Sequence, residues 1–229
     1  MVGDVRVAPA AGTPDRPLIS SDRMKVAFIG THGVGKTTLC YDLAAALKKR
    51  DLSVELVREV ARECPLPINR ETTLKAQSWI LHTQIAWELQ AEAKADVVFC
   101  DRAVLDNYCY MRRAFAGAPD EAVLEALVRS WTATYDALFK VPIVGDPRFD
   151  GVRDTDLAFQ REIDGAIEQT LAAWSVPHVA LDPARRAEWG ALVLDALLLR
   201  LKPQELLYPE PEERIAPMAP IAKTGASHA

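Results

Sequence analysis

The sequence predicts an α/β fold with a mainly parallel sheet, and two observations lead to it. Short apolar runs typical of buried strands alternate with longer segments in which apolar residues recur at helical spacing. The octet GTHGVGKT at residues 30–37 stands between the first such strand and the first such helix. Strands that alternate with helices form right-handed βαβ units, which place the strands parallel in one sheet.

Apolar runs predict five strands. The third run ends directly at an acidic residue, the fourth is weakened by Pro142, and the fifth is short. The expected ranges are 25–29, 54–57, 97–100, 137–143 and 178–181. Because ligands of parallel sheets bind beyond the carboxyl ends of the strands, the residues that follow each strand are the first candidates for a functional role.

Helical patterns predict six helices between and after these strands. Leu39, Leu43 and Leu47 share one face of the first helix, and Pro119 stands near the first turn of the fourth. The expected ranges are 38–50, 72–95, 106–116, 121–134, 156–174 and 184–201.

The chain length of 229 residues suits one domain, which we place at residues 24–201. Residues 1–23 mix Gly, Pro, Ala, Asp and Ser without periodicity, and residues 202–229 are rich in proline. Such segments bury little apolar surface, so we expect a disordered N-terminal extension and a disordered C-terminal tail.

Composition narrows the functional class. A formal net charge of −5 provides no general basic field for nucleic acid. The four cysteines show neither a C-x-x-C pair nor a zinc-site spacing, which favours a reducing compartment. There is no secretory signal pattern and no apolar stretch of about 18 residues. We therefore expect a cytoplasmic protein that contacts neither a membrane nor nucleic acid.

The octet at residues 30–37 fits the phosphate-binding pattern G-x-x-x-x-G-K-[ST] without a mismatch. Its glycines let backbone N–H groups surround phosphate oxygens, and the following helix points its positive end at the same anion. Lys36 is expected to reach the β- and γ-phosphates of ATP, and the Thr37 hydroxyl to bind Mg²⁺. The expected nucleotide-binding residues are Gly30, Gly33, Val34, Gly35, Lys36, Thr37 and Thr38.

Charged residues follow the second and third expected strands. Asp101 is expected to bind Mg²⁺, with a helix cap or turn as the alternative, and Arg102 either binds substrate or forms a surface salt bridge. Glu59 is a candidate general base for an attacking hydroxyl, and Asp101 is the other candidate. Arg62 lies close by and is expected to bind substrate.

Two further segments carry candidate residues. Arg148, Arg153 and Arg161 lie in or beside a loop with Gly and Pro, where arginines can close over phosphates; the alternative is a solvated loop in which nearby aspartates pair with them. The long second helix carries Trp79, Gln84 and Trp87, and each is a candidate to line a pocket for a ring-bearing substrate. For the two tryptophans, packing in the core is the stronger interpretation.

These segments together resemble the nucleoside and nucleoside-monophosphate kinase branch of the phosphate-loop (P-loop) NTPases. The resemblance rests on GTHGVGKTTL at 30–39, REVARE at 58–63, VVFCDR at 97–102 and the arginine-bearing segment further on. It covers about residues 25–201. Within the branch the chain is most similar to the AAA-type ATPase and kinase group that includes the ribosylnicotinamide kinase domain of bifunctional NAD regulators.

The resemblance implies a three-layer sandwich around a mainly parallel five-stranded sheet of order 2-3-1-4-5, with a helical, arginine-bearing lid. It implies that Glu59 is the base, that Gln84 reads the nucleobase, and that Arg153 and Arg161 are the lid arginines. Ala103 stands where deoxynucleoside kinases usually carry a serine, so the identity of the acceptor stays open.

The leading hypothesis is a Mg²⁺- and ATP-dependent kinase that phosphorylates a hydroxyl of a small, nucleoside-like molecule. The alternative is an ATPase or nucleotide-driven switch that acts on a protein partner. A kinase for nucleic-acid ends is disfavoured by the acidic net charge. The oligomeric state stays open, a homodimer included.

Overall fold

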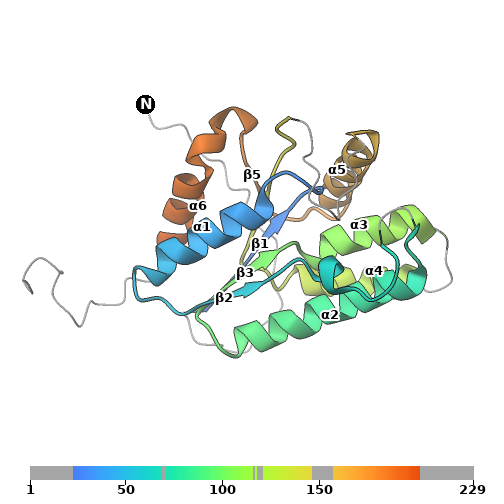
Figure 1. The fold of residues 1–229 in the computed structure, drawn as a ribbon, viewed down its shortest axis with the longest axis horizontal. Coiled ribbons are helices and arrows are strands. Elements are labelled where there is room, and N and C mark those ends of the chain that lie inside the picture. The colour runs from blue at the N-terminus through green and yellow to red at the C-terminus, as the bar shows by residue number, and fades with distance from the viewer. Residues whose placement is uncertain (1–22, 69–70, 116, 118–120, 146–156, 202–229) are drawn as a thin grey trace, which may run out of the picture.

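The fold is an α/β sandwich around one parallel sheet. The computed structural model describes residues 23–68, 71–115, 117, 121–145 and 157–201 (Figure 1). The sheet has the order β2-β3-β1-β4-β5, and every neighbouring pair is parallel. Its strands are β1 (Met24–Ile29), β2 (Val54–Val57), β3 (Val97–Asp101), β4 (Ala137–Lys140) and β5 (Val179–Ala180). This confirms the parallel sheet and the strand order that the resemblance implied.

Helices connect and cover these strands. The α-helices are α1 (Lys36–Lys48), α2 (Leu74–Glu92), α3 (Val104–Phe115), α4 (Glu121–Thr132), α5 (Leu157–Ala173) and α6 (Trp189–Leu198). Two 3₁₀ helices, η1 (Val60–Glu63) and η3 (Pro183–Glu188), follow β2 and β5. Within the described ranges, every helix is too short or too polar to span a bilayer.

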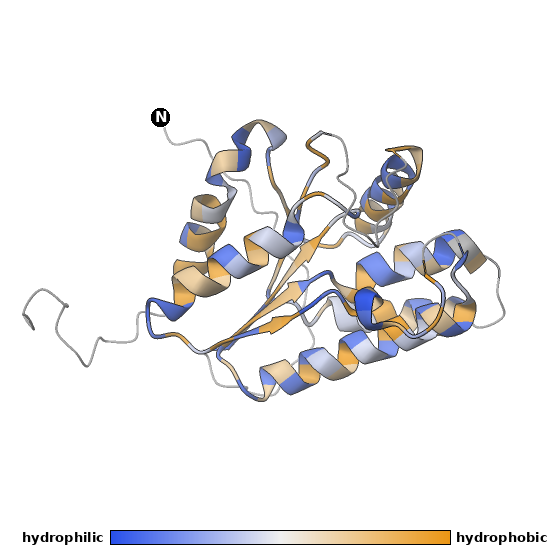
Figure 2. Cartoon of the chain, in the orientation of Figure 1, coloured by the Kyte–Doolittle hydropathy of each residue, from blue (hydrophilic) through white to orange (hydrophobic). Residues whose placement is uncertain are grey.

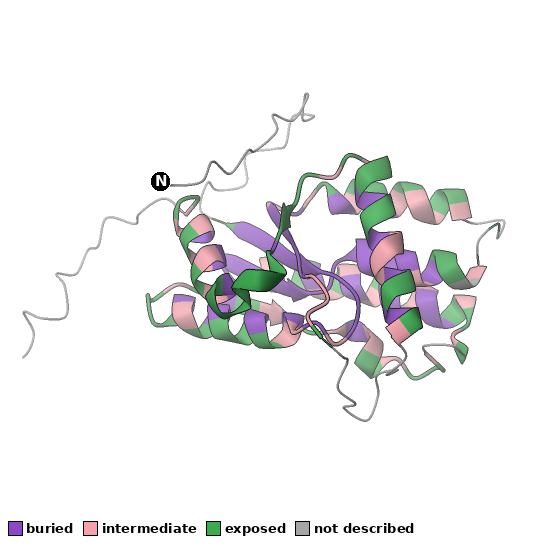
Figure 3. Ribbon diagram, turned by 90° about the horizontal axis from the view of Figure 1, so that it is seen from above, coloured by how far each residue is buried: buried purple, intermediate pink, exposed green. Residues whose placement is uncertain are grey.

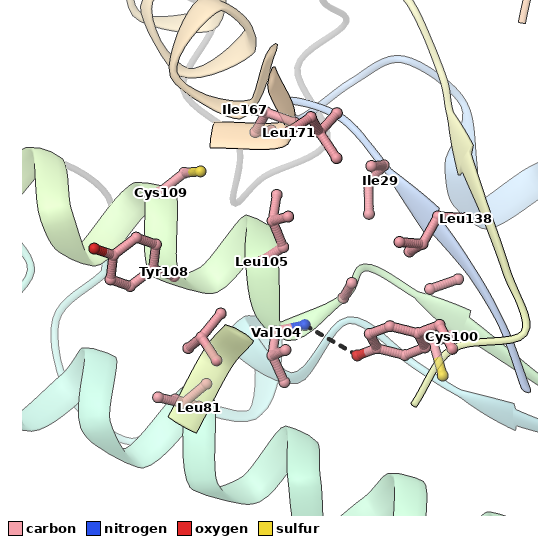
Figure 4. Close-up of a cluster of buried hydrophobic side chains, with 14 of the residues drawn as sticks. Ile29, Leu81, Cys100, Val104, Leu105, Tyr108, Cys109, Leu138, Ile167 and Leu171 are labelled. Atoms are coloured by element: carbon pink, nitrogen blue, oxygen red, sulfur yellow. Dashed lines mark hydrogen bonds between the residues drawn. The ribbon is translucent and has the colours of Figure 1, made fainter. Parts of the chain in front are cut away.

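The sheet separates two apolar cores because side chains of a strand alternate between its faces. Ala27 and Ile29 of β1 face the core under α2, α3, α4 and α5, whereas Val26 and Phe28 face the core under α1 and α6. Figure 1 shows α1 and α6 together on one side of the sheet, with α2, α3 and α4 on the other. Figure 4 draws part of the first core, which includes Leu105 and Ile167.

Burial on both faces explains why the strands are recognisable as continuous apolar runs. All residues of β1, β3 and β4 are buried, and the strands stand out as apolar in Figure 2 and as buried in Figure 3. Full burial of each large aliphatic or aromatic side chain contributes about 1.5–3 kcal/mol.

Element boundaries differ from the predicted ranges by a few residues. The first helix begins at Lys36, so the phosphate-loop lysine belongs to its first turn. The last predicted helix is two elements, because Asp182 caps a 3₁₀ turn through Ala184 N and Pro183 occupies the turn's first position before α6 begins. The fourth strand ends at Lys140, before Pro142. The terminal segments lie outside the described residues, so their predicted disorder stays a prediction.

Parallel register brings the functional candidates to one edge. Phe28 of β1 is paired with Asp101 of β3, and Ile29 with Lys140 of β4. The loop that follows β1 therefore lies beside the carboxyl end of β3, where a ligand of a parallel sheet is expected.

Candidate functional site

The loop between β1 and α1 has the backbone that the phosphate-binding pattern requires. A Cβ atom on Gly30 would lie 2.6 Å from the Val141 carbonyl oxygen, so β1 and the segment after β4 can approach this closely only at a glycine. Gly35 precedes α1 with a φ of 100°, in the left-handed region that favours glycine. The glycine pattern in the sequence thus reflects one close approach and one left-handed turn.

Lys36 is folded back under this loop. Its Nζ donates to the carbonyl oxygens of Gly30, at 2.8 Å, and Thr31, at 2.6 Å. Burial, together with the positive charge of Arg102, lowers the pKa of the Lys36 amine to about 8. The two hydrogen bonds hold the Lys36 amine under the loop. A phosphate anion bound there would stabilise its protonated form, which burial and Arg102 disfavour.

Thr37 and Asp101 form the pair expected to hold Mg²⁺. The Thr37 hydroxyl donates to Asp101 Oδ2 at 2.5 Å, joining the first turn of α1 to the end of β3. Hydroxyl and carboxylate oxygens are the hard ligands that Mg²⁺ prefers, and Mg²⁺ commonly completes its shell with water and substrate phosphates. The described residues contain no cluster of three or more His, Cys, Asp or Glu that could hold a metal ion.

Asp106 is a site residue that sequence reasoning missed. Its carboxylate accepts from Gly30 N and from Ala103 N, both at 2.8 Å, and is fully buried. The group fastens the phosphate loop to the start of α3. The signal in the sequence is an aspartate in the first turn of a helix, a position where a carboxylate caps free N–H groups.

Glu59 lies beyond β2 and faces two arginines. Arg102 Nε donates to its Oε1 at 2.7 Å, and Arg62 Nε donates to its Oε2 at 2.9 Å. Burial alone would raise the pKa of Glu59, but the charges of Arg102 and Lys36 and the two hydrogen bonds outweigh it and hold the pKa well below its ordinary value. Glu59 is consequently a carboxylate at neutral pH, with both oxygens engaged.

Arg102 has a strained backbone. It has a φ of 100°, in a region that non-glycine residues rarely occupy and that costs on the order of 1–3 kcal/mol. The side chain is buried, and its guanidinium carbon lies 5.1 Å from the centre of the Tyr110 ring. Strain of this size persists only where surrounding contacts over-determine the conformation, which often happens at functional sites.

A small cavity adjoins Glu59 and Arg102, and we call it the Glu59 pocket. Its volume is about 50 Å³, and it combines apolar walls with amide, carboxylate and guanidinium groups. The lining residues are His32, Glu59, Ala61, Arg62, Ile68, Gln77, Ile80, Arg102, Asn107 and Tyr110. Within the described part of the chain, Arg102 Nη1 and Asn107 Nδ2 are buried without a hydrogen-bond partner. Buried donors without partners at a cavity wall favour a polar ligand.

A second cavity, the Thr37 cavity, lies on the other side of Glu59. Its volume is about 360 Å³ and its lining includes Thr37, Asp101, Arg58, Glu59 and Arg62. Glu59 and Arg62 line both cavities. The carboxylate therefore stands between the expected magnesium ligands and the Glu59 pocket.

The remaining predicted residues lie elsewhere. Gln84 is fully buried and donates to Glu88 Oε1 and to the Arg102 carbonyl oxygen, and it does not line the Glu59 pocket. Gln77, two helical turns earlier on α2, lines the pocket instead. The spacing of turns along α2 could have suggested Gln77, but only the packing of the helix distinguishes the two glutamines.

Of the two predicted lid arginines, Arg161 is the one within the described residues, and it lines neither the Glu59 pocket nor the Thr37 cavity. Arg161 lies on α5 and lines a separate groove, about 590 Å³, together with Arg112 and Arg113 of α3. Arg148 and Arg153 lie outside the described residues. Trp79 and Trp87 are half-buried on α2, do not line the Glu59 pocket, and the second packs against the core.

The fold, the phosphate-binding loop and this arrangement of side chains define the class: the chain is a P-loop NTPase. A family model described as an AAA domain matches residues 25–188, and the chain belongs to that family.

Solved structures share the fold. NadR protein in complex with NR is 22% identical, with a TM-score of 0.63 over 79% of this chain and 52% of that chain. NadR in complex with NAD and AMP-PNP is 20% identical, with a TM-score of 0.59 over 79% of this chain and 50% of that one. This chain thus spans about half the length of the NadR chains it matches.

A smaller protein matches along its whole length. Deoxyadenosine kinase from M. mycoides, with products dcmp and a flexible dcdp bound, is 17% identical, with a TM-score of 0.55 over 77% of this chain and all of that one. A comparison with curated proteins gave no match. At these identities the likeness establishes the fold, and the chemistry must be argued from the site.

Proposed function

We propose that the protein transfers the γ-phosphate of ATP to a hydroxyl group of a small, nucleoside-like molecule. One observation carries the proposal: Glu59 stands between the Thr37 cavity, beside the phosphate loop, and a second pocket with buried unpaired donors. A hydrolase needs room only for water, whereas a transferase needs a second shaped pocket beside the γ-phosphate. The kinase structures that share the fold support the same interpretation.

On the ATP side, the backbone N–H groups of residues 30–37 surround the phosphates, and the start of α1 adds its positive dipole. Lys36 exchanges its two loop carbonyl partners for phosphate oxygens and stabilises negative charge there. Thr37 and Asp101 provide oxygen ligands for Mg²⁺, which when bound neutralises charge on the β- and γ-phosphates.

On the acceptor side, Glu59 accepts the proton of the attacking hydroxyl. The acceptor oxygen forms a bond to the γ-phosphorus while the bond to the β–γ bridging oxygen breaks, and ADP leaves with that electron pair. Glu59 Oε2 must first lose its bond from Arg62, whose side chain is 35% exposed, whereas the Arg102 side chain is 7% exposed and keeps its bond to Oε1. Asp101 is less suited as the base because it does not line the Glu59 pocket and is the residue expected to hold Mg²⁺ with Thr37.

The Glu59 pocket favours an acceptor with a flat ring and several polar groups. Ile68, Ile80 and Tyr110 provide apolar surface for a ring, while Gln77 and Asn107 offer amide groups that recognise ring or sugar substituents. Because the pocket volume is only about 50 Å³, the acceptor must widen it, and the displacement of Arg62 is the movement that the geometry favours.

The test is ATP turnover, measured alone and with a panel of nucleosides, ribosylnicotinamide and nucleoside monophosphates. We expect little turnover until one compound is added, followed by formation of its phosphorylated product. Lys36→Ala should abolish the transfer, while Lys48→Ala, on the exposed last turn of the same helix, should leave it unchanged. Steady hydrolysis that is indifferent to the whole panel would favour the ATPase or switch instead.

A further inference from the structure

Glu88 is a fully buried carboxylate on α2 that no step of the proposed transfer uses. Its Oε1 accepts from the Tyr135 hydroxyl at 2.7 Å and from Gln84 Nε2 at 2.8 Å. Its Oε2 accepts from Trp131 Nε1 at 2.7 Å and lies 3.3 Å from Lys25 Nζ. The group therefore joins β1, α2, α4 and the segment before β4 inside an otherwise apolar core.

Two of these partners lead to the turn between β3 and α3. Gln84 Nε2 also donates to the Arg102 carbonyl oxygen at 3.3 Å. The Tyr135 hydroxyl accepts from Val104 N at 3.1 Å, a bond drawn as a dashed line in Figure 4. Glu88 Oε1 is thus connected to the backbone on each side of Ala103 through two hydrogen bonds with one side chain between them.

This turn is the strained one. Arg102 has its φ of 100° here, and in this backbone conformation its Nε donates to Glu59 Oε1 at 2.7 Å. The turn is also held by Asp106, which accepts from Ala103 N. Successive backbone groups of residues 102, 103 and 104 are therefore fixed by two buried carboxylates, one directly and one through Gln84 and Tyr135.

Stability alone does not explain why the buried Glu88 carboxylate is paired with Lys25 in this core. Moving a carboxylate and an ammonium out of water costs several kcal/mol per ion, and well-packed apolar residues of similar volume are often as stable or more so. A buried carboxylate whose two oxygens each have two partners, as in Glu88, does, however, favour one geometry for the groups it connects. Here the connected group is the backbone of residues 102–104, which determines the direction of the Arg102 side chain.

We infer that Glu88 is a positioning residue: through Gln84 and Tyr135 it fixes the 102–104 turn and so holds the Arg102 guanidinium against Glu59. The inference rests on the proposed function for its effect on catalysis. It also gives Gln84 a role other than reading a nucleobase, since Gln84 acts on the site through the Arg102 carbonyl.

The test compares Glu88→Gln with Glu92→Gln. Glu92 lies one turn further along α2 and pairs with the same Lys25, but no bond connects it to the turn in the described part of the chain. A carboxamide in place of Glu88 keeps only one oxygen. The Lys25 ammonium and the Trp131 N–H cannot accept a hydrogen bond, so that oxygen is expected to face them, and the N–H₂ group then faces Gln84 and Tyr135, which loosens the tether to the turn. We expect kcat to fall about 10- to 100-fold in Glu88→Gln with the KM for ATP nearly unchanged, and kcat to stay within about twofold of wild type in Glu92→Gln.

Gln84→Met and Tyr135→Phe each remove one of the two side chains that link Glu88 to the turn, while Glu88 keeps its other partners. They replace Glu88→Gln in the test if that variant does not fold. Each should lower kcat less than Glu88→Gln does. In an Arg102→Lys background, Glu88→Gln should add little further loss, because both changes act on the same contact. Full additivity, or equal kcat in Glu88→Gln and Glu92→Gln, would overturn the inference.

Hydrogen exchange separates this inference from the proposed function. The Ala103 and Val104 amides should exchange faster in Glu88→Gln than in Glu92→Gln, relative to the global stability of each variant. If wild type transfers no phosphate to any acceptor but this local difference is present, the proposed function fails and the positioning role stands. If wild type is active and exchange at the turn is equal in both variants, the positioning role fails.

Discussion

At the scale of single residues, the unusual features of the chain gather in one place. The strained backbone of Arg102, the buried amine of Lys36 and the unpaired Asn107 amide all lie beside the phosphate loop or the Glu59 pocket. Sequence reasoning proposed Glu59, Asp101 and Arg102 because they are charged residues at the ends of strands, and each of them lines one or both of the two cavities. It missed residues such as Asn107, because a helical asparagine looks the same in sequence whether it faces solvent or a cavity.

Replacing Arg62 tests whether this residue restrains Glu59. Without Arg62, Glu59 loses one donor and its pKa rises toward the ordinary value, so it becomes a better base for water that enters the widened pocket. We expect acceptor-independent ATP hydrolysis by Arg62→Ala to rise several-fold. Arg58→Ala is the control. Arg58 is exposed, pairs with Glu63, and lines the Thr37 cavity, as Arg62 does. Equal hydrolysis by the two variants would count against the restraint.

The depressed pKa of Glu59 has a consequence for stability. A carboxyl group whose pKa is lower in the folded state than its ordinary 4.5 contributes stability that is fully present above that value and is lost as the pH falls. The difference in unfolding free energy between wild type and Glu59→Gln should be constant from neutral pH to about pH 5 and should shrink below about pH 4.5. Urea denaturation across this range measures it. A difference that grows on acidification would show that the two arginines do not stabilise the carboxylate.

At the scale of elements, the strands could be predicted closely and the turns between them could not. Strands buried on both faces, such as β1 and β3, are visible as largely apolar runs. Helix ends depend on caps and on neighbouring elements, which is why the last predicted helix is in fact a 3₁₀ turn and then α6. The turn after β3 has its conformation because of Glu88 and Asp106, which are distant or inconspicuous in the sequence.

Glycine substitutions distinguish the loop from the helices. Gly30→Ala places a methyl group 2.6 Å from the Val141 carbonyl oxygen at a φ of 143°, and we expect a loss of about 3 kcal/mol or more in unfolding free energy together with weaker ATP binding. Gly165→Ala, in the middle of α5, meets no atom within 4 Å and should stabilise the protein by about 0.5–1 kcal/mol. Thermal and urea denaturation provide both values. A neutral Gly30→Ala would contradict the close approach of the loop to the segment after β4.

At the scale of the whole molecule, one parallel sheet brings β1, β2 and β3 to a common edge, and the chemistry collects there. The strand order could be inferred from the resemblance but not from periodicity, because periodicity identifies strands without saying which strands are neighbours. The position of Glu59 between two cavities is also a property of the assembled fold, since it depends on β2, α1 and α2 together. Glu59 could be proposed from the sequence, but only the packing of these elements shows that it lines two cavities.

The destination of the γ-phosphate tests the central claim most directly. ATP labelled with ¹⁸O on the non-bridging γ-oxygens is incubated with the acceptor selected from the panel, and the products are analysed by mass spectrometry. The account predicts that wild type places the label in a phosphoryl group on the acceptor and that Glu59→Gln, which still binds ATP, does so orders of magnitude more slowly. Label found only in inorganic phosphate, or an unchanged rate of transfer by Glu59→Gln, would contradict it.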